Sequence, residues 1–160
     1  MGKKMLIKKI LFPTDLSDEA KKIFEYVVNF SNGFGSDILI LHVIEELSPS
    51  KEKLMERAIG LEKLKNLHNE KIRQARDVLI GKKRNYEKIN LTKNSIKIDD
   101  KIVAGENISN KICEICFNEK CDIIVMGNRR RTKFEKLLEN SKIESLLEKT
   151  NVPVLVFPIG

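Results

Sequence analysis

Short apolar segments alternate along this chain with longer segments whose apolar residues recur at helical spacing, and this alternation constrains the fold most strongly. The apolar segments are 6–12, 38–43, 96–103, 123–126 and 152–157. Such an alternation predicts a parallel sheet, because parallel strands need a crossover helix between them. We therefore expect an α/β protein with an open five-stranded parallel sheet and helices on both faces.

Local signals predict where these elements begin and end. Pro13 is expected to stop the first strand, and Ser17 to cap a helix with acidic residues in its first turn. Gly33 and Gly35 are expected to end that helix.

The middle of the chain is predicted to join the second strand to a long helix. We interpret residues 46–60 as a connecting segment, with Pro49 and Gly60 as its breaks. A helical stripe starts at Leu61 and runs to Tyr86 or beyond, with Gly81 tolerated inside it. A short helix is predicted over 109–118, and a final helix before the last strand.

Composition and charge narrow the class of protein. The chain has 160 residues, 41% of them hydrophobic and 33% charged, which predicts one globular domain spanning 1–160. It contains no apolar run of membrane-spanning length and no secretory signal at its start, so we expect a cytoplasmic protein. The net charge is +7, with basic excess in 51–88 and 129–136. A solvated, lysine-rich helix face explains the first excess best, and nucleic-acid binding is not expected because the sequence contains no recognition motif.

The carboxyl ends of the predicted strands define a candidate cleft. Asp15, Val43, Gly105 and Gly127 each lie at or just beyond such an end, where open parallel sheets bind ligands. Asp15 has two equally weighted interpretations. Its carboxylate either accepts hydrogen bonds from a ligand such as adenine or ribose, or satisfies the backbone of its own turn.

The basic loop after Gly127 is the candidate phosphate site. Capping boxes starting at Thr132 and Ser141 predict two helix starts, and the free N–H groups at such a start favour an anion. Asn140 can adopt the left-handed conformation that the break between them requires. Arg130 either offers a guanidinium to phosphate or fills the space that a phosphate needs.

Other reactive residues have simpler interpretations. Cys113, Cys116 and Cys121 invite a metal or redox interpretation, but we favour small buried hydrophobes because no fourth ligand is evident. His42 is interpreted as a hydrogen-bonded residue of the core or the cleft edge, and His68 as part of a helix stripe.

Several segments, in this order and nearly end to end, make the chain similar to universal stress proteins. They are Pro13-Thr-Asp-Leu-Ser17, Leu41-His-Val43, Ile102-Val-Ala-Gly105, Asp122-Ile-Ile-Val-Met-Gly127 and Val152-Pro-Val-Leu-Val-Phe157. The resemblance implies a Rossmann-like sheet in the order 3-2-1-4-5. It also implies a homodimer formed through the strand Val152–Phe157.

The resemblance further implies an adenine-nucleotide cleft between the first and fourth strands. The nucleotide-binding branch of the family carries G-x2-G-x9-G-[S/T], where this chain has Gly127, Arg130, Asn140 and Ser141. By similarity Asp15 and Val43 would hold the adenosine part, and Gly127 to Ser141 the phosphates. The expected cofactor-binding residues are Pro13, Thr14, Asp15, Val43, Gly105, Met126, Gly127, Arg129, Arg130, Asn140 and Ser141.

Two functions remain open from the sequence. One is a sensor or switch that binds ATP or another adenine nucleotide with Mg²⁺, has no metal site of its own, and catalyses at most weak ATP hydrolysis. The other is a dimeric stress-response interaction module that binds an unknown protein partner and whose phosphate loop is degenerate. Arg130→Gly would separate the two roles of Arg130: tighter ATP binding would show that the arginine obstructs, and weaker binding that it is a phosphate ligand.

Overall fold

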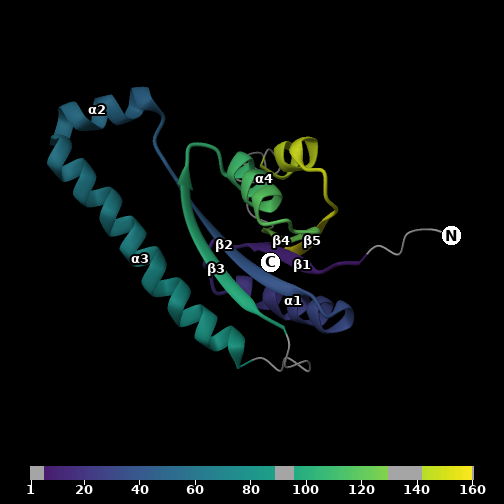
Figure 1. Cartoon of the computed structure of the whole chain (residues 1–160). Helices are drawn as coiled ribbons and strands as arrows, with labels where there is room; N and C mark the ends of the chain where they lie inside the picture. The colour runs from purple at the N-terminus through teal and green to yellow at the C-terminus, as the bar shows by residue number, and fades with distance from the viewer. Residues whose placement is uncertain (1–5, 89–95, 130–141, 160) are drawn as a thin grey trace.

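The strands form one parallel sheet whose order agrees with the prediction. The protein was analysed as a computed structural model, which describes residues 6–88, 96–129 and 142–159. Its strands are β1 (Lys9–Pro13), β2 (Asp37–Glu45), β3 (Ile98–Gly105), β4 (Ile123–Arg129) and β5 (Val154–Ile159). They lie in the order β3-β2-β1-β4-β5, with every neighbouring pair parallel (Figure 1).

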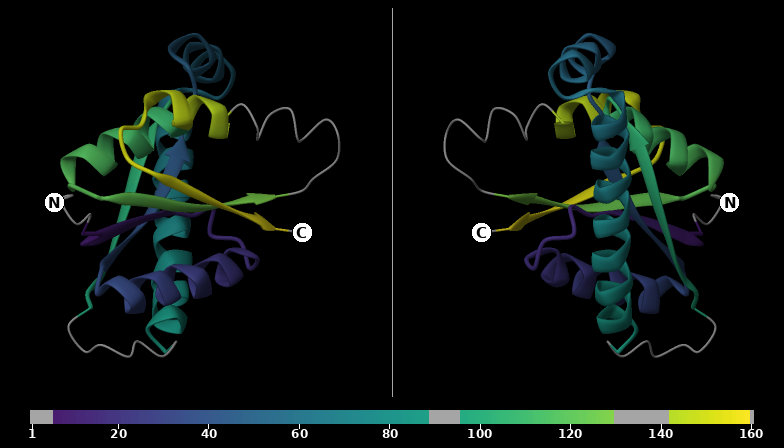
Figure 2. Two further views of the ribbon diagram at one scale, coloured as in Figure 1. Left: turned by 90° about the vertical axis from the view of Figure 1, so that its right-hand side faces the viewer. Right: turned by 90° about the vertical axis from the view of Figure 1, so that its left-hand side faces the viewer.

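Helices cover both faces of this sheet. They are α1 (Ala20–Phe34), α2 (Pro49–Ile59), α3 (Leu61–Glu87), α4 (Ile108–Asn118) and a helical stretch over 142–149. Figure 2 shows α4 and helix 142–149 on the side of the sheet opposite to α1. None of the described helices is long and apolar enough to cross a membrane.

The two apolar cores follow from the alternation of side chains along the strands. Ile10 and Phe12 of β1 point to one face and pack with buried residues of α1 and α3. Leu11 points to the other face and packs with α4 and with Leu146 of helix 142–149. The central strands are apolar on both faces, as a doubly covered parallel sheet requires.

Helix α3 is anchored to the body by its second half. Its buried residues are Ala75, Leu79 and Tyr86. The Tyr86 ring stacks on Phe24 of α1 with 4.0 Å between ring centroids. α2 lies beyond the carboxyl end of β2, and α3 starts at the far end of α2 and runs back along the side of β2 and β3 (Figure 1).

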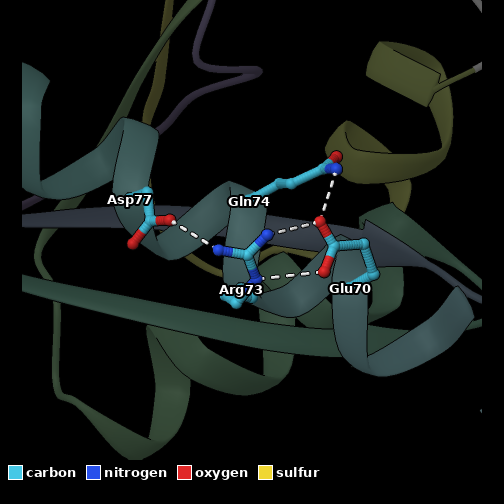
Figure 3. Close-up of polar contacts among 4 residues, drawn as sticks. All are labelled: Glu70, Arg73, Gln74 and Asp77. Atoms are coloured by element: carbon cyan, nitrogen blue, oxygen red, sulfur yellow. Dashed lines mark hydrogen bonds and ion pairs between the residues drawn. The ribbon is translucent and has the colours of Figure 1, made fainter. Parts of the chain in front are cut away.

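An exposed polar network stabilises the middle of α3 along its own surface. Glu70 accepts hydrogen bonds from Arg73 Nη2 at 2.6 Å and from Gln74 Nε2 at 2.9 Å (Figure 3). Arg73 Nη1 also lies 3.6 Å from Oδ2 of Asp77, which is one helical turn further along. These spacings of three and four residues place the partners on one helix face, where such pairs support a helix that packing does not hold. The hydrogen bond from Arg73 lowers the pKa of Glu70, and the same bond raises the pKa of Arg73.

The interpretation of residues 46–60 as a connecting segment was wrong, because most of it is α2. Pro49 starts this helix instead of interrupting the chain, since proline fits the first turn, where its missing N–H is not needed. Ser48 precedes it in an extended conformation. Gly60 separates α2 from α3 with φ +85°, a backbone angle that favours glycine.

The predicted start of α1 was also wrong. Ser17 does not cap the helix, which begins at Ala20 after Glu19. Residues 14–17 instead form a turn: Leu16 has φ 64°, and its N–H donates to Thr14 Oγ1 at 3.1 Å. Gly35 ends α1, as predicted, and has the left-handed conformation, whereas Gly33 lies inside the helix.

Strand bounds differ from the prediction by a few residues, and the continuous α3 is confirmed. The third strand begins at Ile98 and includes Gly105, whereas the sequence predicted 96–103. The fourth strand continues beyond Met126, because β4 and β5 keep pairing as far as Arg129 and Ile159. Gly81 lies inside α3, as predicted.

Candidate functional site

A cavity of about 230 Å³ lies beyond the carboxyl ends of β1 and β4. This is the point where strand order reverses, since the chain proceeds from β1 to β2 on one side and from β4 to β5 on the other. Six of the predicted site residues line it: Pro13, Thr14, Asp15, Val43, Met126 and Gly127.

Hydrogen bonds fix the turn after β1 at the cavity wall. The Thr14 N–H donates to the Leu41 carbonyl at 2.8 Å, which continues the pairing of β1 with β2. His42 Nδ1–H donates to the Thr14 carbonyl at 2.9 Å. His42 is therefore the hydrogen-bonded residue of the cleft edge that the sequence suggested, and it also lines the cavity.

Asp15 stabilises its own turn, which was one of its two predicted roles, and it also lies where the other role, contact with a ligand, would place it. Its Oδ1 accepts the Ser17 N–H at 3.0 Å, so the carboxylate does stabilise its own turn. The same residue lies on the cavity wall. A carboxylate held in this way presents hydrogen-bond acceptors at a fixed position beside the cavity.

Much of the cavity wall is apolar. Leu41 and Val43 of β2 contribute side chains from the sheet, and Ile108 and Ile112 contribute from α4. Sequence reasoning did not assign the two isoleucines to a site, because their helical spacing fits any buried helix face. The walls suit a flat apolar group, while the turn after β1 adds polar atoms at the rim.

Lys142 brings a positive charge to the cavity, and sequence reasoning missed it. It begins the described part of helix 142–149 and lines the cavity with Ile143. The Ser109 hydroxyl of α4 donates to the Lys142 carbonyl at 2.9 Å, which fixes this end of the helix. The sequence did contain a signal for Lys142, because this residue directly follows Ser141, the predicted helix cap.

Not every predicted site residue reaches the cavity. Gly105 does not line it, because β3 lies two strands away from the β1–β4 boundary. The backbone of Gly105 instead accepts the Glu46 N–H at 2.9 Å and lies beneath Lys111, whose Cγ would be 2.6 Å from an added Cβ.

The remaining predictions concern the loop after β4. Arg129 is the last residue of β4, and its side chain lies outside the described part of the structure. Arg130, Asn140 and Ser141, together with the capping box at Thr132, lie outside the described residues. Their roles stay predictions.

Within residues 6–88, 96–129 and 142–159, no three His, Cys, Asp or Glu side chains are grouped so that they could hold a metal ion. Cys113, Cys116 and Cys121 are free thiols. His68 lies on α3, and its Nε2 is 3.9 Å from Oε1 of Glu46.

The sheet order and the position of the cavity define a doubly wound α/β protein with a ligand-type cleft at its topological switch point. Comparison with known proteins narrows this class. The sequence profile of the Universal stress protein family matches residues 6–158. The chain belongs to the universal stress protein family.

Individual relatives cover almost the whole chain. Universal stress protein MJ0577 of Methanocaldococcus jannaschii is 30% identical to it, and the alignment covers 95% of this chain and 95% of the relative. Its solved structure has a TM-score of 0.73 and covers 96% of both chains.

Two more distant structures share the fold and contain a nucleotide. A universal stress protein in complex with cAMP has a TM-score of 0.58 at 15% identity and covers 97% of this chain and 99% of its own. One from Archaeoglobus fulgidus in complex with dAMP has a TM-score of 0.52 at 14% identity and covers 98% of this chain and 100% of its own.

Proposed function

We propose that this protein binds an adenine nucleotide in the cavity at the β1–β4 boundary and acts as a sensor or switch. The observation that carries the proposal is the composition of that cavity: apolar walls, the carboxylate of Asp15 and the lysine that is the first described residue of helix 142–149. A nucleotide needs each of these groups, since it joins an apolar aromatic base to a polar sugar and an anionic phosphate chain.

The adenosine part is proposed to lie against the turn after β1. Val43 and Ile112 would contact the faces of the base, because both are apolar and line the cavity. The carboxylate of Asp15 and the backbone of Thr14 would contact the polar edge of the base or the ribose. Selectivity for adenine would then come from the turn that His42 fixes.

The phosphates are proposed to lie toward Gly127 and Lys142. Gly127, near the carboxyl end of β4, leaves space for phosphate oxygens near the backbone, and Lys142 would supply a compensating charge. Any Mg²⁺ would arrive with the nucleotide and be held mainly by phosphate oxygens and water, which is how this ion is usually bound. The loop carrying Arg129, Arg130, Asn140 and Ser141 is proposed to complete the phosphate site.

The chemistry of this site favours binding over turnover. Among the described residues that line the cavity, Asp15 is the one carboxylate, and its Oδ1 already accepts the Ser17 N–H. Efficient hydrolysis would need a group that positions or activates the attacking water. At most weak ATP hydrolysis is expected, and nucleotide occupancy would be the signal. The relatives solved with cAMP and dAMP share this fold and support an adenine nucleotide as the ligand class.

Release of bound ligand tests the proposal directly. The purified protein is denatured, and the supernatant is analysed for adenine nucleotides by chromatography and mass spectrometry. Recovery of ATP, ADP or AMP in proportion to protein supports the sensor. Protein that releases no nucleotide, and also gives no calorimetric heat with millimolar Mg²⁺–ATP, would favour the alternative interaction module.

We also propose that the protein forms a homodimer through the C-terminal strand segment Val152–Phe157. β5 is the last strand of the sheet order, and its residues Val154 to Phe157 are half-buried and apolar. Pairing this edge with a second copy would remove an exposed apolar edge from water. Light scattering on Val156→Lys tests it: a dimer in the unmodified protein and a monomer in the variant support the proposal, and an unmodified monomer contradicts it.

A further inference from the structure

The C-terminal end of α4 holds Cys116 and Cys121 together through its backbone. The Cys121 N–H donates to the Cys116 carbonyl at 2.9 Å, and the Lys120 N–H donates to the Phe117 carbonyl at 3.1 Å. Lys120 has φ 53°. These features make a Schellman motif, in which the side chains at the first and sixth positions contact each other. In this chain both positions are cysteines.

The two thiols are buried but adjoin a cavity. Cys116 is 4% exposed and Cys121 is 5% exposed. The Cys116 Sγ lies 3.9 Å from the Cys121 carbonyl oxygen. Both residues line a second cavity, of about 640 Å³, separate from the nucleotide cavity and bounded also by Cys113 and Lys149. A small uncharged oxidant therefore has a route to the pair from one side.

The contact between the thiols makes them chemically different. The side-chain hydrogen bond with Cys121 lowers the pKa of the Cys116 thiol, and the same interaction raises the pKa of Cys121. Burial raises the pKa of Cys113, which lies one turn earlier on α4. Because the thiolate is the reactive form, this direction favours Cys116 as the attacking sulfur.

We propose that Cys116 and Cys121 form a modification site that hydrogen peroxide converts to an intramolecular disulfide. The Cys116 thiolate attacks one peroxide oxygen, the O–O bond breaks, and the leaving hydroxide takes up a proton to become water, which gives a sulfenic acid. The Cys121 sulfur then attacks the Cys116 sulfur, the S–S bond forms and the S–O bond breaks. The departing hydroxide takes the proton of the Cys121 thiol and leaves as a second water. Two thiols are oxidised and one hydrogen peroxide is reduced to two waters.

A purely structural role for the pair makes a different prediction. Small buried hydrophobes commonly fill the contact of a Schellman motif, and cysteines that serve only this purpose are inert toward peroxide. The proposal therefore requires a disulfide that forms in the folded protein, links these two residues specifically, and reverses with a thiol reductant.

Tryptic mapping distinguishes the linkages. The folded full-length protein is treated with hydrogen peroxide, alkylated and digested with trypsin. Cleavage after Lys120 places Cys113 and Cys116 in peptide 112–120 and Cys121 in peptide 121–129. A Cys116–Cys121 disulfide joins the two peptides, whereas a Cys113–Cys116 disulfide stays inside the first.

Matched serine variants complete the assignment. Cys113→Ser should still give the joined peptides, which excludes a Cys113–Cys121 linkage. Cys116→Ser should abolish them. Cys121→Ser should leave a sulfenic acid on Cys116 that a 1,3-dione reagent traps, and this readout does not depend on a disulfide.

Three results would overturn the proposal. The first is that the thiols of the folded protein stay unmodified after peroxide treatment. The second is that the joined peptides disappear in Cys113→Ser, and the third is that folded and urea-denatured protein yield equal amounts of them. Circular dichroism of each variant before treatment verifies that it is folded.

Discussion

A hydrogen bond between His42 and Thr14 connects β2 to the turn after β1, at the wall of the candidate site. His42 Nδ1–H donates to the Thr14 carbonyl at 2.9 Å, from β2 to the turn after β1. Thr14 and Asp15 are consecutive, so this bond holds the backbone next to Asp15 on the cavity wall. The histidine therefore acts on the site by positioning the turn.

Removing this donor should weaken nucleotide binding without unfolding the protein. A neutral hydrogen bond contributes about 1 kcal/mol, so His42→Leu should reduce ATP affinity by roughly 3–10-fold. Asn has an amide donor at a similar distance from the backbone as Nδ1, so His42→Asn should restore most of the loss. Calorimetric titration of both variants checks this. Equal affinity in His42→Leu and the unmodified protein would refute the positioning role.

Lys142 should act on the phosphates of a nucleotide and not on its base. Lys142→Gln is expected to weaken ATP binding about 5–10-fold at low salt, with a smaller effect on AMP and little on adenosine, because the lost attraction scales with ligand charge. Lys149→Gln is the matched control: it lies on the same helical stretch, donates to Asn110 Oδ1 at 2.6 Å and does not line this cavity. Similar losses for ATP and adenosine would show that Lys142 supports the fold instead.

Two leucines of α3 should differ sharply in their effect on stability. Leu79 is 1% exposed and Leu67 is 50% exposed. Leu79→Ala should lower the free energy of unfolding by about 2–5 kcal/mol, since it leaves a cavity in the core between α1 and the sheet. Leu67→Ala should change it by less than about 0.5 kcal/mol. Urea denaturation measures both. Similar losses would mean that the first half of α3 is buried by a partner or a second copy.

The Glu119 carboxylate should make a pH-dependent contribution to stability. Hydrogen bonds from Lys101 and Lys9, the latter at 3.0 Å, lower its pKa below the ordinary value of 4.5. A lowered folded-state pKa stabilises the fold above the unfolded-state pKa, and this stabilisation is lost as the pH falls through the folded-state pKa.

Glu119→Gln tests this sign. The variant should be less stable than the unmodified protein by about 0.5–1 kcal/mol near neutral pH, with the difference shrinking toward zero in acid. Urea denaturation as a function of pH gives the curve, and the same substitution in a Lys101→Met background should have a smaller effect. A difference that stays constant as the pH falls would contradict the ion-pair origin.

The fold could be predicted because its signals are local and mutually consistent. Apolar strands separated by helical stripes indicate a parallel sheet, and Gly35 indicates the end of α1. The order of the strands came from the resemblance and not from the pattern itself. These two errors share a cause: Pro49 and Ser17 each fit more than one turn or helix-start geometry, and the residue type alone does not determine which one forms.

The site could be predicted only where the strand ends specify it. Asp15, Val43 and Gly127 lie at the cavity because a parallel sheet gathers its carboxyl ends at one edge. Ile108, Ile112 and Lys142 come from helices whose distance from that edge depends on packing. Gly105 carried the same strand-end signal but lies at the end of β3, too far from the switch point. Sequence position alone does not separate these cases.

Calorimetric titration of Mg²⁺–ATP into the nucleotide-free protein tests the central claim most directly, with one variant that fills the cavity and one that does not. Ile108 lines the cavity, whereas Leu147 is 53% exposed and does not. We predict a saturable heat with about one ATP per chain. This heat should be lost in Ile108→Trp and kept in Leu147→Trp. No heat at millimolar ATP, or equal binding by Ile108→Trp and the unmodified protein, would contradict nucleotide binding at this site.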